Sequence, residues 1–315
     1  MQYELRYQVI EPKRQTYQNL IDRFGDQPAS RYLEATMDVE PRENFHYRPT
    51  WTSGRELYDP GYSALRLADP YQFTDPRQFY YTPYVSSRAA LHDEFSKTLG
   101  YIEERDLLTR LPAGWRSLLA TVVVPLRHYE SGAELVSVAG ARFAYGTSLE
   151  QCCTFAAFDR IGNAQLLSRI GIALGRGTAA ELTAAKTEWL DGTHLQPLRR
   201  LTEQIMVTED WAEGILAMDF VDSLIYPLLY QRLEERAAPG DGGAYSLLAR
   251  YFSAWFSDQR RWLDALAAAW RDDPEHGAAN LVELERIEAA WHGPAEAAVA
   301  VLANAAEGCL EGPGR

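Results

Sequence analysis

The six histidines of the chain are its first candidates for chemistry, because carboxylate-bridged di-iron sites in helical bundles pair histidine with glutamate. Such a site takes two Glu-x-x-His pairs from two helices and one Glu from each of two others. Only one histidine has Glu three residues before it, in Glu43-Asn-Phe-His46. This pair lies between Pro41 and Pro49, which disfavour a helix there, and one pair cannot hold two irons. The sequence therefore predicts no di-iron site in this chain.

A second kind of candidate site is formed by the acids and arginines of four long segments that are predicted below to be helical. These acids could form a metal or acid–base site, or they could pair with the arginines in a charge network at the bundle centre or surface. A metal site does not need a competing cation, so the nearby arginines favour the charge network. The residues are Arg127, His128, Glu130 and Glu134 in one segment, Asp159 and Arg160 in a second, Asp219 and Asp222 in a third, and Asp258, Arg260 and Arg261 in a fourth.

A glycine-rich stretch, Gly175-Arg-Gly177-Thr-Ala-Ala180, superficially matches a dinucleotide-binding fingerprint. That fingerprint requires a strand before it and a helix after it, whereas the residues before it continue a helical pattern from Ser148. We interpret the stretch as a turn between helices. The sequence contains no Gly-x-Ser-x-Gly elbow, phosphate-binding loop or zinc signature, so the residues by themselves indicate a soluble interaction or structural subunit.

Helical periodicity begins near residue 76 and continues to the end of the chain. Thr74 or Asp75 can cap the first helix, with Pro76 in its first turn. Kinks are expected at Pro125 and Pro227, and a break at Gly293-Pro294. Long helices joined by shorter ones predict an all-α bundle. The predicted helices cover 76–101, 103–111, 114–145, 148–173, 178–190, 196–206, a long segment from 208, 244–271 and 278–310.

Residues 1–72 differ from this helical body, which spans residues 73–310. They hold six of the sixteen prolines together with many aromatic rings. Frequent proline favours extended backbone, and a disordered tail would be poor in aromatic residues. We therefore predict an extended, aromatic- and Pro-rich N-terminal arm that packs against the body of this chain or against a partner.

The composition excludes several classes of protein. The chain has 315 residues, 46% of them hydrophobic, and a formal net charge of −13. An acidic chain without a basic patch is not expected to bind nucleic acid, and no run approaches the roughly 18 apolar residues of a membrane span. The N-terminus lacks a signal pattern. Three cysteines, two of them adjacent at Cys152 and Cys153, indicate core residues of a cytoplasmic protein.

Several stretches, in order along the chain, resemble one known family. The chain is similar to the smaller (β) hydroxylase subunit of soluble multicomponent di-iron monooxygenases, and within that family to the phenol hydroxylase β subunit. The resemblance runs from about residue 10 to about residue 270 and is weak in the Ala-rich tail after residue 275. It is carried by residues 20–49, Asp75-Pro-Arg-Gln-Phe-Tyr-Tyr81, Leu107-Leu-Thr-Arg-Leu111, Val124-Pro-Leu-Arg-His128, Leu167-Ser-Arg-Ile170 and Asp210-Trp211.

The resemblance implies a ferritin-like fold without iron ligands, with no cofactor and no catalytic residue in this chain. The implied complex is an NADH-dependent phenol 2-monooxygenase whose large hydroxylase subunit holds the di-iron centre. Its other partners would be a small third hydroxylase subunit, an effector protein, and a reductase that carries FAD and [2Fe-2S]. Three such subunits would form a protomer of a dimer, in which this chain braces the large subunit.

The arm and the start of the helical body hold the rings expected to contact the large subunit, since aromatic side chains are effective interface anchors. Three alternatives stay open from the sequence: the same role in a toluene or alkene monooxygenase, a self-sufficient ferritin-like metal enzyme, and an unrelated helical adaptor. The candidate interface residues are Phe24, Tyr32, Phe45, Tyr47, Trp51, Phe79, Tyr80 and Tyr84.

Overall fold

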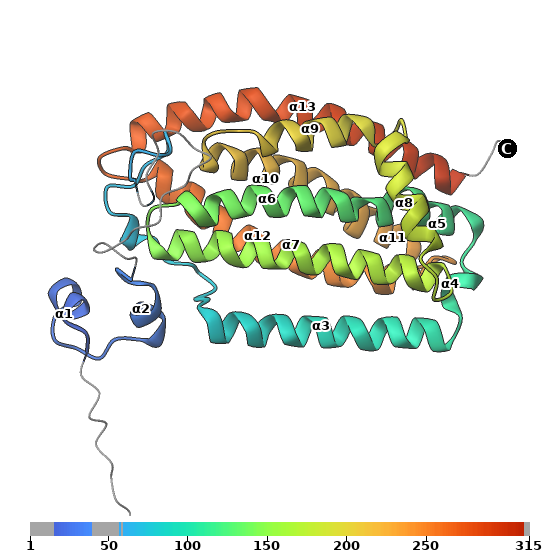
Figure 1. Ribbon diagram of the computed structural model, residues 1–315, viewed down its shortest axis with the longest axis horizontal. Coiled ribbons are helices and arrows are strands. Elements are labelled where there is room, and N and C mark those ends of the chain that lie inside the picture. Colours follow the sequence, from blue (N-terminus) through green and yellow to red (C-terminus); the bar gives the residue numbers. More distant parts are fainter. Residues whose placement is uncertain (1–15, 40–56, 58, 312–315) are drawn as a thin grey trace, which may run out of the picture.

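The computed structural model describes residues 16–39, 57 and 59–311. The elements assigned in these residues are all helical, which confirms the predicted all-α bundle (Figure 1). The α-helices are α1 (Gln18–Phe24), α2 (Arg31–Thr36), α3 (Tyr81–Glu104), α4 (Leu107–Arg110), α5 (Ala113–Leu118), α6 (Arg127–Phe143), α7 (Thr147–Leu174), α8 (Ala180–Asp191), α9 (Gln196–Met206), α10 (Trp211–Pro227), α11 (Leu233–Ala237), α12 (Gly243–Arg271) and α13 (Gly277–Glu311).

The antiparallel pair α6 and α7 lies at the centre of the molecule, with α12 behind it and α3 running along its lower side (Figure 1). Close packing of the pair depends on small residues. A Cβ atom at Gly140 of α6 would lie 2.7 Å from the Sγ atom of Cys153 in α7, which is closer than real contacts allow. The core behind them is rich in large rings, including the fully buried Trp255 and Trp262 of α12 and Tyr226 of α10.

Prolines interrupt two helical segments at the predicted positions. Pro125 lies in a 3₁₀ turn (Val124–Leu126) that follows a π-helical turn (Leu119–Val123). Pro227 ends α10 and is followed by a second π-helical turn (Leu228–Arg232). Proline has no backbone N–H and its ring clashes with the carbonyl four residues earlier, so the hydrogen-bond pattern shifts locally. Both predicted kinks therefore take the form of changes in helix type.

The prediction that the first long helix starts at residue 76 is wrong, because α3 begins at Tyr81. Asp75 does act as a cap, but of a turn: its Oδ1 atom accepts a hydrogen bond of 2.9 Å from the backbone N–H of Arg77. Gln78 then has a φ of 53°, which an α-helix does not allow. The turn closed by Asp75 thus delays the helix by five residues.

The predicted break at Gly293-Pro294 is also wrong, because α13 continues through Pro294 to Glu311. Proline inside a helix costs about 3 kcal/mol, and tertiary packing offsets this cost. Ala295, Ala298 and Leu302 follow the proline at helical spacing and are each at most 3% exposed. Burial of this stripe keeps the helix continuous across Pro294.

The described part of the predicted arm packs on the body of the chain itself. The Tyr32 hydroxyl lies 3.3 Å from the hydroxyl of Ser148 and accepts a hydrogen bond of 2.7 Å from the backbone N–H of Asp75. Further along, the ring of Tyr62 stacks on Phe143 with centroids 4.5 Å apart. These contacts place the described part of the segment against the body of the chain, and α1 and α2 lie within the segment that was predicted to be extended. Among the described helices, none is long and apolar enough to cross a membrane.

Candidate functional site: a buried charge network

Three helices meet at a buried ion triad in the centre of the bundle. Arg160 of α7 lies between Glu130 of α6 and Asp222 of α10: its Nη1 atom is 3.1 Å from the Oε2 atom of Glu130, and its Nη2 atom pairs with Asp222. All three side chains are at most 4% exposed. Each carboxylate also accepts a hydrogen bond from a tyrosine hydroxyl. Tyr226 donates to Glu130 and Tyr129 donates to Asp222, both at 2.6 Å.

The electrostatics of the triad follow from one guanidinium shared between two carboxylates. Burial raises the pKa of Glu130, and Arg160 only partly opposes this rise. Burial would lower the pKa of Arg160, but Asp222 and Glu130 hold it well above its usual value. Burial also raises the pKa of both tyrosines, so they remain protonated donors. Removing one charged member of this triad would destabilise the fold, because it would leave a buried charge without its partner.

A second buried cluster joins α3 to α7 and α12. The guanidinium of Arg88 in α3 makes two parallel bonds to Asp159 of α7, at 2.8 Å from Nε and 2.6 Å from Nη2. The same Nη2 atom lies 2.7 Å from the Oδ2 atom of Asp258 in α12. A bidentate arginine–carboxylate pair is stronger than a hydrogen bond between neutral groups. This pair connects residues 71 positions apart in the chain.

The turn before α3 belongs to the same network. Arg77 pairs with Asp75 at 3.0 Å and with Asp258 at 3.5 Å. Asp258 therefore accepts from two arginines, one on each side of the start of α3. Trp255 connects this cluster to the triad. The Arg160 guanidinium lies 4.8 Å from the centroid of the Trp255 ring, and the indole N–H of Trp255 donates to Asp159. The network thus spans α3, α6, α7, α10 and α12.

The predicted pairing of acids with arginines is confirmed for the inward-facing residues. Glu130, Asp159, Arg160, Asp222 and Asp258 all take part, and Asp219 pairs with Arg260 at the edge of the bundle.

The remaining candidates lie elsewhere. His128 stacks on Trp189 with centroids 6.1 Å apart, which accounts for its inward position without a ligand. Arg261 lies 3.6 Å from Asp258 at the exposed end of the network and donates to the carbonyl of Pro76 at 3.2 Å. Arg127 and Glu134 do not take part in the hydrogen bonds and ion pairs of Glu130 and Asp222.

Arg88 and Arg77 are charged members that reasoning from the sequence missed, as are the hydrogen-bond donors Tyr129, Tyr226 and Trp255. A signal for Arg88 exists, because it is the only Lys, Arg, Asp or Glu between Arg77 and Asp93. A lone charge on an otherwise uncharged helical stretch requires a partner when it is buried. The partner could not be identified from the sequence, since Asp159 is distant along the chain.

The central side chains do not fit a di-iron centre. Arg160 and Asn163 stand at the i, i+3 spacing that would present Glu and His, and both reach the Oε2 atom of Glu130, at 3.1 and 3.5 Å. A guanidinium offers only N–H donors and does not deprotonate in proteins. Within residues 16–39, 57 and 59–311, no group of three or more His, Cys, Asp and Glu side chains is arranged to hold a metal. Glu43 and His46 lie outside the described residues.

The candidate interface rings have different positions. Tyr32, Phe79 and Tyr84 are buried within the chain itself, and Tyr84 stacks on Phe155 with centroids 4.2 Å apart. Tyr80 is half-buried as the residue before α3, and Phe24 is 40% exposed. The three buried rings therefore fasten α2 and α3 to α7. Phe45, Tyr47 and Trp51 lie outside the described residues.

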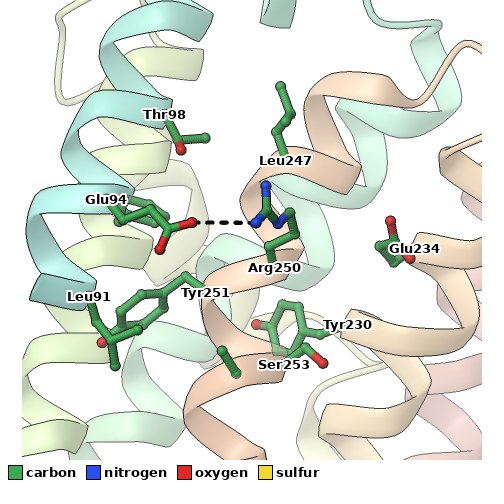
Figure 2. Close-up of a pocket in the computed structure, with 11 residues that line it drawn as sticks. Leu91, Glu94, Thr98, Tyr230, Glu234, Leu247, Arg250, Tyr251 and Ser253 are labelled. Atoms are coloured by element: carbon green, nitrogen blue, oxygen red, sulfur yellow. Dashed lines mark hydrogen bonds and ion pairs between the residues drawn. The ribbon is translucent and has the colours of Figure 1, made fainter. Parts of the chain in front are cut away.

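A groove of about 530 Å³ lies beside the network, between α3 and α12 (Figure 2). The Nη2 atom of Arg250 reaches across it to Glu94 at 3.4 Å, and both side chains are well exposed. Phe95, Tyr230 and Tyr251 form part of its lining. The side chains that line the groove include no histidine and no cysteine, so they offer no nucleophile–base pair of the usual kinds.

Two curated relatives match most of the chain. The chain is 42% identical over 267 residues to the phenol 2-monooxygenase oxygenase component DmpL of Pseudomonas sp. strain CF600, covering 84% of this chain and 81% of the relative. It is 34% identical over 307 residues to the phenol 2-monooxygenase oxygenase component MhpL of Acinetobacter pittii strain PHEA-2, covering 96% and 92%.

Two solved structures share the fold. A chain of xenon-pressurised phenol hydroxylase from Pseudomonas sp. OX1 superposes with a TM-score of 0.88 at 36% identity, covering 96% of this chain and 92% of that one. A chain of toluene 4-monooxygenase with toluene bound superposes with a TM-score of 0.81, covering 96% and 100%, and its 19% identity supports the fold alone. The model of the Methane/Phenol/Alkene Hydroxylase family matches residues 49–274. Because most of its length matches that model, this chain belongs to the Methane/Phenol/Alkene Hydroxylase family.

Proposed function

We propose that this chain is the non-catalytic, structural β subunit of a multicomponent di-iron phenol hydroxylase, and that it braces the iron-bearing large subunit in a dimer of three-subunit protomers. The observation that carries the proposal is the position of Arg160, whose guanidinium lies between Glu130 and Asp222 at the bundle centre. A fixed cation there competes with any metal for the same carboxylates. The names of the two relatives, both phenol 2-monooxygenase oxygenase components, support the substrate class.

The charge network gives the proposed role a physical basis. It ties five helices together through bonds that leave few rotamers free, so the bundle can present a rigid surface to a partner. A rigid neighbour helps ligand-bearing helices hold their geometry, as outer contacts do around metal ligands. Oxygen chemistry then belongs to the large subunit, and electrons come through a reductase with FAD and [2Fe-2S], with a third hydroxylase subunit and an effector protein completing the system.

The N-terminal arm remains part of the proposal. Phe24, Phe45, Tyr47 and Trp51, together with the half-buried Tyr80 just after the arm, are candidates for contact with the large subunit. The arm is best tested by replacing Phe45, Tyr47 and Trp51 together with alanine in the full chain, because deleting residues 57–72 would also remove contacts such as Tyr62 with Phe143. Unchanged assembly with the large subunit would exclude these three rings from the interface.

The deciding experiment measures iron in the full chain purified alone and in its complex with the large subunit. Each sample is incubated with Fe(II) without oxygen, desalted and assayed for iron and for phenol hydroxylation. We expect this chain alone to retain far less than one iron, and the complex to hold about two irons per large subunit. Glu130→Gln is the matched variant, since it removes the central carboxylate that a metal would need.

About two irons on the isolated chain, lost in Glu130→Gln, would overturn the structural-subunit proposal in favour of a metal enzyme. Failure of the chain to associate with any large hydroxylase subunit would overturn it as well. Hydroxylation of toluene or an alkene in preference to phenol by the assembled complex would correct the substrate and leave the structural role in place.

A further inference from the structure

The outward side of α7 lacks charged side chains over most of its length. Between Gln151 and Ser168 the only charged residues are Asp159 and Arg160, and both are buried in the network. In a chain with 24% charged residues, a long exposed helix usually carries charges on its solvent side. The exposed side of this segment instead consists of apolar and neutral polar residues.

The exposed residues on this side are large and apolar. Phe158 and Ile161 of α7 are 52% and 39% exposed, and Leu135 and Val138 of α6 are 52% and 43% exposed. The register that places Gly140 beside Cys153 and Arg160 beside Glu130 also brings Leu135 level with Phe158. We name these four residues, together with Val85 of α3 (41% exposed), the α6–α7 face.

Val85 extends the α6–α7 face onto α3. The ring of its neighbour Tyr84 lies 6.4 Å from the ring of Phe158, so α3 borders the face on this side. The three helices lie one beside the next in Figure 1, with α7 between α6 and α3. Exposed large apolar side chains gathered on neighbouring helices mark sites of protein association.

We infer that the α6–α7 face docks an uncharged, apolar helical surface of the large hydroxylase subunit, an inference that rests on the proposed function. The face has the size that such contact needs. The stretch 151–168, whose exposed side carries no charge, extends about 27 Å, and a strip about 20 Å wide along it buries roughly 500 Å² per partner, which reaches the roughly 1,000 Å² in total that a specific interface needs. No unpaired charge is desolvated in this contact, because the two charges of this stretch are already neutralised inside the bundle.

The net charge of the chain argues against a second copy as the occupant. Each copy carries −13, and like charges of this size keep proteins apart. An uncharged helical surface of a different subunit can pack on α7 at ordinary interhelical distance.

The test introduces charge on the face and, as a control, on an exposed apolar residue elsewhere. Phe158→Glu and Ile161→Glu are compared with Val282→Glu on α13, where Val282 is 66% exposed. Each full-length variant is co-purified with the large subunit and its dissociation constant is measured. We expect a loss of at least about tenfold in affinity for each face variant, as buried aromatic anchors at interfaces cause, and no loss for Val282→Glu. The melting temperature of the isolated chain should be the same in all four proteins.

Two further readouts separate the outcomes. Amide exchange across 154–168 should slow on complex formation, and Phe158→Leu should retain wild-type affinity. If the wild-type chain assembles and the face variants bind as tightly as Val282→Glu, this inference is overturned while the proposed function stands. If the wild-type chain forms no complex, the proposed function itself fails. If the isolated chain dimerises and Phe158→Glu is monomeric, the face serves a second copy and the assignment to the large subunit is wrong.

Discussion

The indole N–H of Trp255 donates a hydrogen bond of 3.0 Å to the carboxylate of Asp159. These two residues join α12 to α7 at the point where the two arginine clusters meet. On one side of Asp159 lies the guanidinium of Arg88, and on the other the ring of Trp255 covers Arg160. The charge network is therefore continuous through a single carboxylate, and it makes the following predictions.

Asp159→Asn should strongly destabilise the chain, because Asp159 also accepts from Tyr84 at 2.9 Å and its loss leaves Arg88 with one carboxylate partner. Removing one member of a buried ion pair costs about 3–5 kcal/mol. Urea unfolding of the isolated chain measures the change. Asp93→Asn is the matched control, since Asp93 forms an exposed pair with Lys97. The unfolding midpoint of this variant should equal that of the wild type. Equal midpoints for the two variants would contradict the prediction.

Arg160→Met should lose more stability than a triple variant that also carries Glu130→Gln and Asp222→Asn. The single change leaves two buried carboxylates facing each other, whereas the triple change removes their charge as well. We expect a loss of about 3–5 kcal/mol for the single variant and a smaller one for the triple variant. The measurement is the free energy of unfolding of both variants, obtained by chemical denaturation. A triple variant that is less stable than the single one would show that the acids do not depend on Arg160.

Asp219 should make stability depend on pH in the acid range. Burial raises its pKa to about 6, although Arg260 opposes the rise and Asp222 adds to it. Because the folded pKa lies above the unfolded value of 3.8, the favourable contribution is complete below about pH 4 and is lost as the pH rises to about 6. The total change is on the order of 2–3 kcal/mol.

Asp219→Asn removes this dependence. The unfolding free energy of the wild type minus that of the variant should therefore fall between pH 4 and pH 6 and then level off. Asp264→Asn serves as the control, because Asp264 also pairs with Arg260 but its side chain is 64% exposed. A difference curve for Asp219→Asn that is flat across this range would contradict the raised pKa.

Gly140→Ala should disturb the packing of α6 on α7. The added methyl group would lie 2.7 Å from the Sγ atom of Cys153 and 3.5 Å from Ile215, and overpacking of this kind costs about 1–3 kcal/mol. Gly100→Ala in α3 is the control, since no atom lies within 4 Å of its new methyl group and alanine stabilises a helix by about 0.5–1 kcal/mol relative to glycine. Thermal unfolding should therefore shift in opposite directions. Shifts in the same direction would show that the pair tolerates a wider spacing.

The sequence by itself determined the class of the fold and most of its helices. The helix predicted at 196–206 is α9, those at 148–173 and 244–271 match α7 and α12 within one residue at each end, and the interruptions at Pro125 and Pro227 are present. Helical periodicity, caps and prolines act between residues a few positions apart, so these features can be read locally. The abundance of arginine near the inward acids likewise indicated a charge network.

Tertiary structure decided the features that depend on distant parts of the chain. The buried stripe at Ala295 and Leu302 holds α13 together across Pro294, which local propensity alone would break. The pairing of Arg88 with Asp159 joins residues far apart in sequence, and neither residue carries a sign of its partner. Such contacts form only when whole helices pack, because burial makes an unpaired charge too costly and selects the one arrangement that neutralises it.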